Sequence, residues 1–130
     1  MDQRTENFNN EEVAVLRHVL QLLPTMEEGM DYTREKLKQG QPEACLGILG
    51  DLIEAFEGVE QSLLPLLNKL EAPEYMKKHD RLKEVFAEMV EEYEHRQGAE
   101  AYTLMEGELY PAFAAWKEEL EENLSPLTAS

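Results

Sequence analysis

The sequence has little cysteine and little positive charge. Cys45 is the single cysteine among 130 residues, so the chain can form neither an intramolecular disulfide nor a thiolate zinc cluster. Lysine and arginine together number 12 against 28 aspartates and glutamates, which gives a formal net charge of −16. Such a surface repels the phosphates of nucleic acids and the anionic headgroups of lipids. We therefore expect neither a nucleic acid nor a membrane as a partner.

Long apolar runs are absent as well. Residues 1–10 are polar and lack the apolar segment of a secretory signal peptide. No apolar stretch approaches the roughly 20 residues that a transmembrane helix needs. These two observations predict a cytoplasmic protein. Its acidic surface either serves solubility alone or attracts a basic protein segment or a divalent cation.

Sequence patterns of common catalytic sites are also missing. Ser62 and Ser125 do not lie in a nucleophile-elbow pattern, and no glycine-rich phosphate loop follows a predicted strand. Cys45 lies on an apolar helix row, which is typical of a buried hydrophobic residue. Its place about one turn into the helix leaves a reactive thiol as the alternative. We expect a protein that is not an enzyme and that binds no cofactor.

The most informative stretch runs from Pro42 to Leu70. Its apolar residues recur at steps of three and four, the spacing that lines one face of an α-helix. Two adjacent rows make this face broad, and a broad apolar face needs more than one neighbour to cover it. We therefore place this helix between others in a bundle. The first row consists of Cys45, Leu49, Leu52, Phe56, Val59, Leu63, Leu66 and Leu70, and the second of Leu46, Leu49, Ile53, Phe56, Leu63, Leu67 and Leu70.

Start and stop signals divide the rest of the chain. Asn9 and Asn10 precede the first predicted helix as capping residues. The apolar phase continues across Pro24, which favours one kinked helix over two separate ones. Pro65 lies on the outer side of the second helix and should bend it. The predicted helices span about 11–39, 42–70, 74–97 and 99–123, and the predicted flexible ends are 1–9 and 125–130.

Short connections between long helices make neighbours antiparallel. The predicted fold is therefore all-α: one domain over residues 1–130, an antiparallel up-down-up-down four-helix bundle with proline-kinked long helices. No strand-like alternation and no internal repeat competes with this interpretation.

Glu92 and His95 form a Glu-x-x-His pair on one helix. Carboxylate-bridged di-iron and di-manganese bundles use two such pairs and further glutamates, whereas His18 and His79 supply no second copy here. A solvated charge cluster is the simpler interpretation of the pair. A metal-binding bundle enzyme with Glu92 and His95 as ligands is kept as an alternative function.

Gly47 and Gly58 lie on the outer stripe of the most apolar predicted helix. Glycine in a helix interior costs about 0.5–1 kcal/mol relative to alanine. We hypothesise that these glycines let a neighbouring helix or a second protein approach closely. The alternative is that a stable bundle tolerates them without any role.

The last predicted helix reads Glu106-Gly-Glu108-Leu109-Tyr-Pro111, and Trp116 follows five residues after the proline. This resembles a Glu-x-Glu-Leu-x-Pro-x-x-x-x-Trp signature of small bacterial all-helical proteins that form a family of unknown function. The resemblance implies an all-helical fold and no known activity. Its residues Glu106, Glu108, Pro111 and Trp116 join Gly47 and Gly58 as candidate partner-contact residues.

The opening segment, from Leu23 to Leu52, is also similar to the start of that family. We therefore predict a non-enzymatic cytosolic helical bundle that acts through protein–protein contacts, with another protein or a second copy as partner. Size, acidity and helix content are similar to those of export chaperones of flagellar and secretion systems, which hold partner helices. An export-type chaperone is thus a further alternative.

Overall fold

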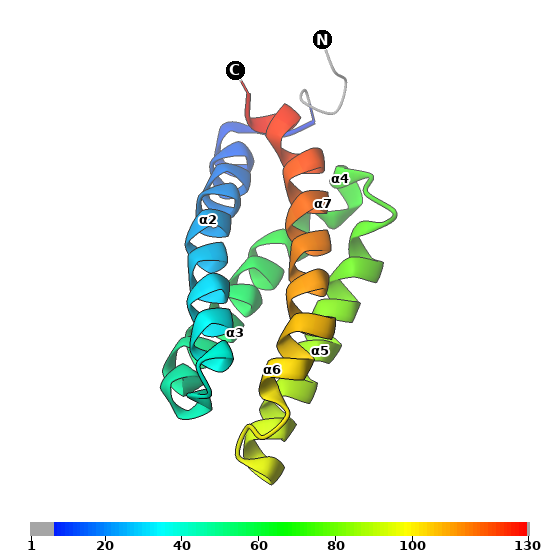
Figure 1. The fold of residues 1–130 in the computed structure, drawn as a ribbon. Helices are drawn as coiled ribbons and strands as arrows, with labels where there is room; N and C mark the ends of the chain where they lie inside the picture. Colours follow the sequence, from blue (N-terminus) through cyan, green and yellow to red (C-terminus); the bar gives the residue numbers. More distant parts are fainter. Residues whose placement is uncertain (1–6, 130) are drawn as a thin grey trace.

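The computed structural model describes residues 7–129, and in this part of the chain all regular secondary structure is helical. Four helical segments follow one another and run in alternating directions (Figure 1). The predicted all-α four-helix bundle is therefore confirmed. The segments are α2 (Asn10–Lys38); η1 (Pro42–Cys45), α3 (Leu46–Leu63), η2 (Leu64–Leu66) and α4 (Leu67–Leu70); α5 (Tyr75–Arg96); and α6 (Ala101–Leu104), η3 (Met105–Leu109) and α7 (Tyr110–Thr128).

Helix α2 begins with a capping box. The Asn9 side chain accepts a hydrogen bond from the Glu12 N–H at 2.8 Å, and Glu12 Oε1 accepts one from the Asn9 N–H at 3.0 Å. The helix then continues through Pro24, as the uninterrupted apolar phase predicts. It ends at Lys38, and Gly40 follows with a φ of 74°, a left-handed conformation that glycine adopts without a steric penalty.

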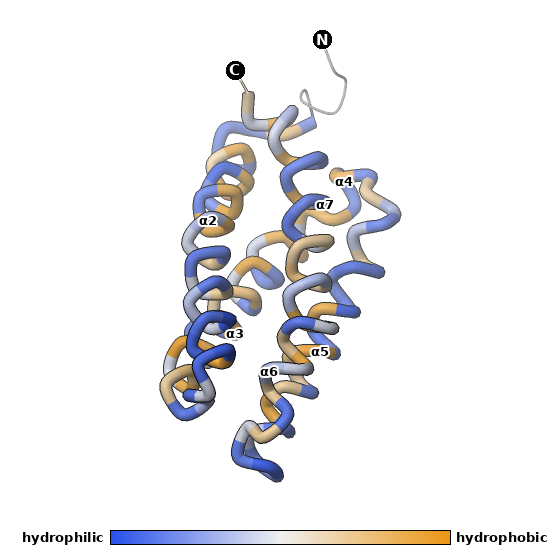
Figure 2. Tube along the Cα trace, in the orientation of Figure 1, coloured by the Kyte–Doolittle hydropathy of each residue, from blue (hydrophilic) through white to orange (hydrophobic). Residues whose placement is uncertain are grey.

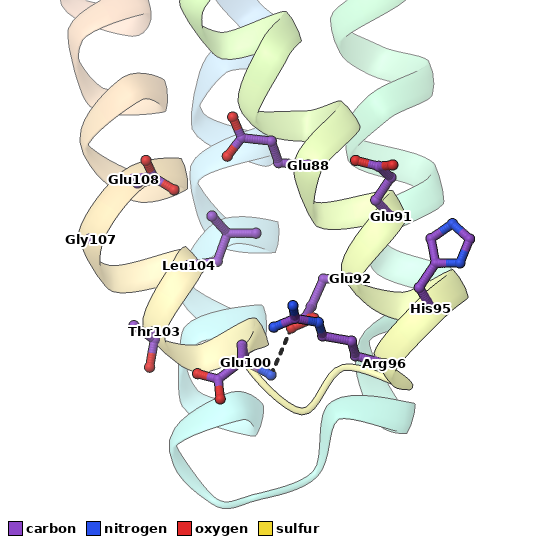
Figure 3. A pocket seen from close by; sticks show the side chains of 10 residues that line it. All are labelled: Glu88, Glu91, Glu92, His95, Arg96, Glu100, Thr103, Leu104, Gly107 and Glu108. Carbon is purple, nitrogen blue, oxygen red and sulfur yellow. Dashed lines mark hydrogen bonds between the residues drawn. The ribbon is translucent and has the colours of Figure 1, made fainter.

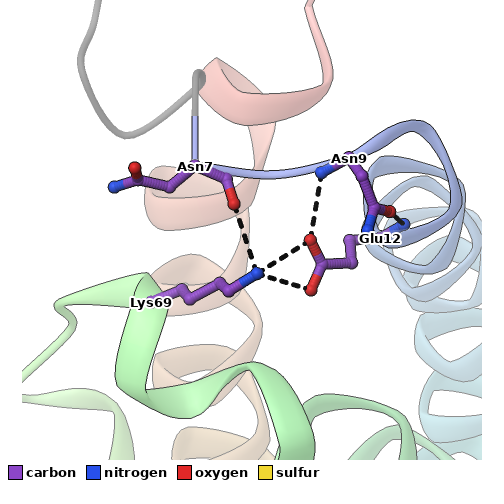
Figure 4. Close-up of polar contacts among 4 residues, drawn as sticks. All are labelled: Asn7, Asn9, Glu12 and Lys69. Carbon is purple, nitrogen blue, oxygen red and sulfur yellow. Dashed lines mark hydrogen bonds and ion pairs between the residues drawn. The ribbon is translucent and has the colours of Figure 1, made fainter.

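The start of the described chain is held in place by Lys69 of α4 (Figure 4). The Lys69 ammonium donates to both carboxylate oxygens of Glu12, at 2.8 and 3.0 Å, and to the Asn7 carbonyl at 3.2 Å. The ring of Phe8 is buried nearby. The last three residues of the segment predicted to be flexible thus make defined contacts, and their flexibility stays a prediction, while residues 1–6 lie outside the described part of the chain.

The second segment differs from the single α-helix predicted for 42–70. It opens with the 3₁₀ turn η1, and a second 3₁₀ turn, η2, separates α3 from α4 at Pro65. Proline has no N–H to donate to the carbonyl four residues earlier, and its ring crowds that carbonyl. The predicted bend at Pro65 is thus a short 3₁₀ interruption of the α-helical hydrogen bonding.

Helix α5 ends in a left-handed turn. Gln97 has a φ of 56° and Gly98 a φ of 81°. A Cβ atom on Gly98 would lie 2.9 Å from the Cβ of Pro42 and 3.0 Å from Cε1 of Tyr93. Glycine is therefore required here by the backbone conformation and by the lack of space. The Tyr93 hydroxyl also donates to the Pro42 carbonyl at 2.8 Å and joins α5 to η1.

The fourth segment contains one π-helical turn, η3, at the residues of the sequence signature. The Tyr110 N–H donates to the Met105 carbonyl, five residues earlier. Pro111 follows, and the wider turn gives its ring room at the carbonyl four residues before it. The π-turn thus ends two residues before a proline, at a point where α-helical hydrogen bonding is interrupted.

The C-terminal end of the bundle also differs from the prediction. Helix α7 runs through Pro126 to Thr128 instead of ending near residue 123. Leu124 and Leu127 are buried in the core, and this contact holds the last turn in place. The predicted helix end near 123 is therefore wrong, the predicted flexibility of 125–129 stays a prediction, and Ser130 lies outside the described part of the chain.

Three sides of the bundle are closed by helix packing: α2 packs against α3 and α7, and α7 packs against α5. Phe56 of α3 lies at the centre, with its ring centroid 5.5 Å from that of Phe86 in α5 and 5.4 Å from that of Trp116 in α7. On the fourth side, the described backbones of α3 and α5 approach each other less closely than these three pairs. The broad apolar face of α3 is thus covered directly by α2 and through side chains by α5 and α7.

Hydrophilic positions recur along all four helical segments (Figure 2). The buried residues fall at steps of three and four, with polar residues between them, as in α2 and α5. Within residues 7–129, none of the helices has the apolar length that crossing a lipid bilayer requires.

Candidate functional site

Glu106 and Glu108 connect η3 to two different helices. The Arg34 guanidinium of α2 forms two hydrogen bonds with the Glu106 carboxylate, at 3.0 and 3.1 Å. The Arg81 guanidinium of α5 donates to Glu108 Oε1 at 3.1 Å. Residues two apart on a helix point to opposite sides, so η3 is bonded to both of its neighbours. The Arg34 bond lowers the pKa of Glu106, and the Glu106 carboxylate raises the pKa of Arg34.

Trp116 is fully buried in the core, with 0% of its surface exposed. Its ring packs against Phe56 and Phe113, with centroid distances of 5.4 and 5.9 Å. The prediction of Trp116 as a partner-contact residue is therefore wrong, because a buried side chain presents no surface to a partner. Pro111 is exposed but acts on the backbone of η3. Glu106 and Glu108 are half-buried and Pro111 is exposed, so contact of these three residues with a partner stays a prediction.

Gly47 and Gly58 are exposed on α3. No described atom outside the local helix lies within 4 Å of a Cβ built on either residue. The hypothesis of a close contact with a neighbouring helix is therefore wrong within the described chain. The hypothesis of contact with a second protein stays a prediction.

Glu92 and His95 do not converge on a common point. Glu92 is 8% exposed, and its Oε1 accepts the backbone N–H of Glu100 at 3.0 Å, which fixes the turn before α6. The exposed His95 ring points away from Glu92 (Figure 3). Over residues 7–129, no group of three or more His, Cys, Asp or Glu residues is arranged to hold a metal ion. Glu92 is thus a structural capping residue of this turn.

An open pocket of about 670 Å³ lies between the C-terminal half of α5 and the α6–η3 segment (Figure 3). Half of its ten lining residues are glutamates. Burial and the neighbouring Glu108 carboxylate raise the pKa of Glu88 at its edge. The pocket is therefore electronegative. Its glutamates are Glu88, Glu91, Glu92, Glu100 and Glu108.

A second hollow, of about 310 Å³, lies between α3 and α5 on the loosely packed side of the bundle. We call it the α3–α5 groove. Phe56 and Phe86 are almost fully buried beneath it, whereas Ile53 and Val90 are half-buried and Ala87 is exposed. Its lining is thus largely apolar and reachable from solvent. The full lining is Ile53, Phe56, Glu57, Glu60, Lys83, Phe86, Ala87 and Val90.

Two exposed leucines lie on the same helical face of α3 as the groove residues Ile53, Glu57 and Glu60. Leu46 is 54% exposed and Leu64 is 62% exposed. They share a helical face with Gly50 and Ile53, since the steps from 46 to 50, 53, 57, 60 and 64 alternate between four and three. Leu64 also contributes to a neighbouring hollow of about 60 Å³ between α3 and α5.

A buried histidine joins the two walls of the groove at one end. His79 of α5 is 4% exposed, and its Nε2 lies 2.8 Å from Glu60 Oε2 of α3. The Phe56 ring stacks on it, with centroids 5.1 Å apart. Lys83 donates to the same Glu60 oxygen at 3.1 Å, and its hydrogen bond, ahead of that of His79, lowers the pKa of Glu60. Glu60 is thus held in one orientation at the groove rim.

Cys45 is fully buried. Its Sγ lies 3.7 Å from the Thr33 carbonyl oxygen, and burial raises the pKa of the thiol. A protonated, enclosed thiol is a poor nucleophile, so the structure favours the hydrophobic role over the reactive one.

Sequence reasoning found Ile53 and Phe56 as apolar helix residues but did not identify the groove that they line. A signal was present in Leu46 and Leu64, which share one face of the second predicted helix. The wall contributed by α5 carried no comparable signal, because Ala87 is small and lies among charged residues. Which side of a bundle stays open is decided by tertiary packing.

Comparison with known proteins identifies the family of this chain. Neither a curated protein nor a solved structure matches the chain. A family model described as a domain of unknown function (DUF8042) matches residues 14–119, which include the α3–α5 groove, the acidic pocket and the signature residues of η3. The chain belongs to this family of domains of unknown function.

Proposed function

We propose that the chain is a non-enzymatic binding module that takes a partner protein in the α3–α5 groove. The observation that carries this proposal is the open fourth side of the bundle, where the rings of Phe56 and Phe86 lie under a solvent-reachable apolar hollow. A bundle that served only as a structural unit would close this side, because burying apolar area stabilises a fold by about 25 cal/mol per Å².

The surroundings of the groove support a protein ligand over a small-molecule reaction. Among the described residues, Lys83 is the only cation that lines the groove, and it is paired with Glu60. The described lining of the groove contains no Ser, Thr or Cys nucleophile. A second hollow, lined in part by exposed Leu64, lies next to the groove on the same side of the bundle. Two open hollows in line between two helices fit a polypeptide better than a compact metabolite.

The same geometry bears on the two alternative functions, an export-type chaperone and a metal enzyme. An export-type chaperone is one specific form of this proposal and would hold its client in the same groove. A carboxylate-bridged metal enzyme gains no support, because Glu92 is engaged by a backbone N–H and His95 points elsewhere. The location that we propose is the cytoplasm, supported by a single cysteine with a buried thiol.

Site-specific photo-crosslinking in the native cell tests the proposal. A photoreactive residue at Ala87, on the groove wall, should yield a defined crosslinked protein. The matched control is Ala14, an exposed alanine on α2 that does not line the groove. Products that form equally at both positions, or at neither, would contradict the proposal.

A further inference from the structure

A second hollow lies toward α4, beyond the Glu60–His79 contact that ends the groove. Its volume is about 60 Å³, Leu64, Leu67 and Met76 contribute to it, and it shares Glu60 with the groove. Along α5 the two hollows extend from Met76 to Val90, a span of roughly 21 Å at the α-helical rise per residue. This length corresponds to a docked helix of about 14 residues.

The helical walls of the groove favour a helical ligand over an extended one. Both walls are α-helices, whose backbone N–H and C=O groups are already bonded within the helix. An extended peptide would find no backbone partner and would leave its own polar groups unpaired against apolar side chains. A helix satisfies its backbone internally and presents apolar side chains at steps of three and four. Gly50 leaves space for it, since no described atom outside the local helix lies within 4 Å of a Cβ built there.

The charges beside the groove determine which sign of charge the polar face of a docked helix should carry. Two helical stripes border it, residues 46, 50, 53, 57, 60 and 64 on one side and 76, 80, 83, 87, 90 and 94 on the other. Four acids and one base lie on them. The base, Lys83, is paired with Glu60 at 3.1 Å, and Asp80 Oδ1 lies 2.9 Å from His79 Nδ1. Among the described residues, Glu57 and Glu94 are the two of these acids that form no ion pair. The four acids are Glu57, Glu60, Asp80 and Glu94.

The same charge argues against a second copy of the chain as the occupant. Each copy has a formal net charge of −16, so self-association through this acidic border would bring like charges together. A ligand with lysine or arginine beside its apolar face meets the opposite sign.

We infer that the α3–α5 groove binds an amphipathic helix of another protein, with apolar residues on one face and basic residues on its flanks. This inference rests on the proposed function and specifies its partner. The apolar side chains of the ligand pack over Phe56 and Phe86, between Ile53 and Val90. The basic side chains lie toward Glu57 and Glu94 at the groove border.

The test uses three fluorescent peptides of about 18 residues, long enough for the groove and one further helical turn. The first is amphipathic with leucines on one face and lysines on its flanks. The second has glutamates in place of the lysines, and the third has the composition of the first in a scrambled order. Anisotropy is measured at low salt and again at high salt.

We expect the lysine peptide to bind, and both other peptides to bind at least about tenfold more weakly, a difference of about 1.4 kcal/mol. High salt should weaken the binding of the lysine peptide several-fold, because salt screens exposed charges. Ala87→Arg should reduce binding at least about tenfold, since it places bulk and positive charge in the groove. Ala14→Arg, the matched control, should change binding less than about twofold.

Equal binding by the scrambled peptide, or by the Ala87→Arg variant, would overturn the inference. A dimer of the native chain that Ala87→Arg dissociates, measured by sedimentation, would also overturn it by identifying the occupant as a second copy. A crosslink at Ala87 without peptide binding would reject the helical, basic ligand and keep the proposed function. Absence of both the crosslink and the binding would reject both.

Discussion

His79 Nε2 lies 2.8 Å from Glu60 Oε2, so a side-chain hydrogen bond crosses from α5 to α3 at the end of the groove. On this side of the bundle the helix backbones are more widely separated, and side chains make the connection. Phe56 stacks on the histidine from α3. The end of the groove is therefore defined by a contact between a buried histidine and a half-buried glutamate.

Removal of this contact should destabilise the bundle. His79→Ala deletes a buried ring and its hydrogen bonds with Glu60 and Asp80, and we expect a loss of about 2–3 kcal/mol in the free energy of unfolding. Urea denaturation at neutral pH measures it. His79→Phe is the companion variant, because it retains an aromatic ring next to Phe56 and loses only the polar contact. If His79→Ala unfolds at the urea concentration of the native protein, the contact has no structural role.

Glu106→Gln should destabilise the protein in a pH-dependent way. Both partners of the Arg34–Glu106 pair are about one-third exposed, so solvent screening limits the expected loss at neutral pH to about 0.5–1 kcal/mol. The folded-state pKa of Glu106 is lowered by Arg34. The stabilisation is therefore present above the ordinary carboxyl pKa and disappears as pH falls through the lower, folded-state value.

Urea titrations of Glu106→Gln and the native protein at several pH values check this prediction. The difference between them should be constant near neutral pH and should shrink below about pH 4. A difference that grows on acidification would mean that the carboxylate is not stabilised by its partner.

Gly58→Ala and Gly98→Ala should change stability in opposite directions. Gly58 is an exposed helical residue with open space around its Cβ position, so alanine should stabilise by about 0.5–1 kcal/mol. Gly98 has a φ of 81° and would place a Cβ 2.9 Å from Pro42, so alanine should destabilise by at least about 1 kcal/mol. Thermal unfolding measures both. A lower melting temperature for Gly58→Ala would revive the close-contact hypothesis for this glycine.

Tyr75→Phe should leave stability unchanged or raise it by up to about 1 kcal/mol. Within the described chain, the buried Tyr75 hydroxyl and the Trp116 Nε1 each have no hydrogen-bond partner. Burial raises the pKa of Tyr75 to about 12, so the hydroxyl is neutral at physiological pH. Calorimetry of the variant measures the change. A loss of more than about 1 kcal/mol would show that the hydroxyl has a partner, such as an enclosed water.

The helix pattern was predictable because it depends on residues three and four apart. The row from Cys45 to Leu70 predicts a helical segment, and Pro65 marks where it is interrupted. The row does not show that the interruption is a 3₁₀ turn, since backbone pairing next to a proline responds to the packing around it. Pro126 shows the opposite case: the sequence predicts an end, but burial of Leu127 carries the helix past the proline.

The candidate site was less predictable than the fold. The signature suggested Trp116 as a surface residue, but a motif does not state which way a side chain points, and this one points into the core. Glu106 is bonded to Arg34 of α2, 72 residues away along the chain, and Glu108 is bonded to Arg81 of α5, 27 residues away. Pairings at such separations, like the open side between α3 and α5, follow from the assembled bundle.

Amide chemical-shift mapping with the lysine-flanked amphipathic peptide tests the central claim most directly. The account predicts that shifts concentrate on residues 53–60 of α3 and 83–90 of α5, on both walls of the groove. It also predicts that the amide chemical shifts of the α2 residues around Ala14 stay unchanged. Shifts confined to the acidic pocket around Glu100 and Thr103, with the groove residues unaffected, would contradict it.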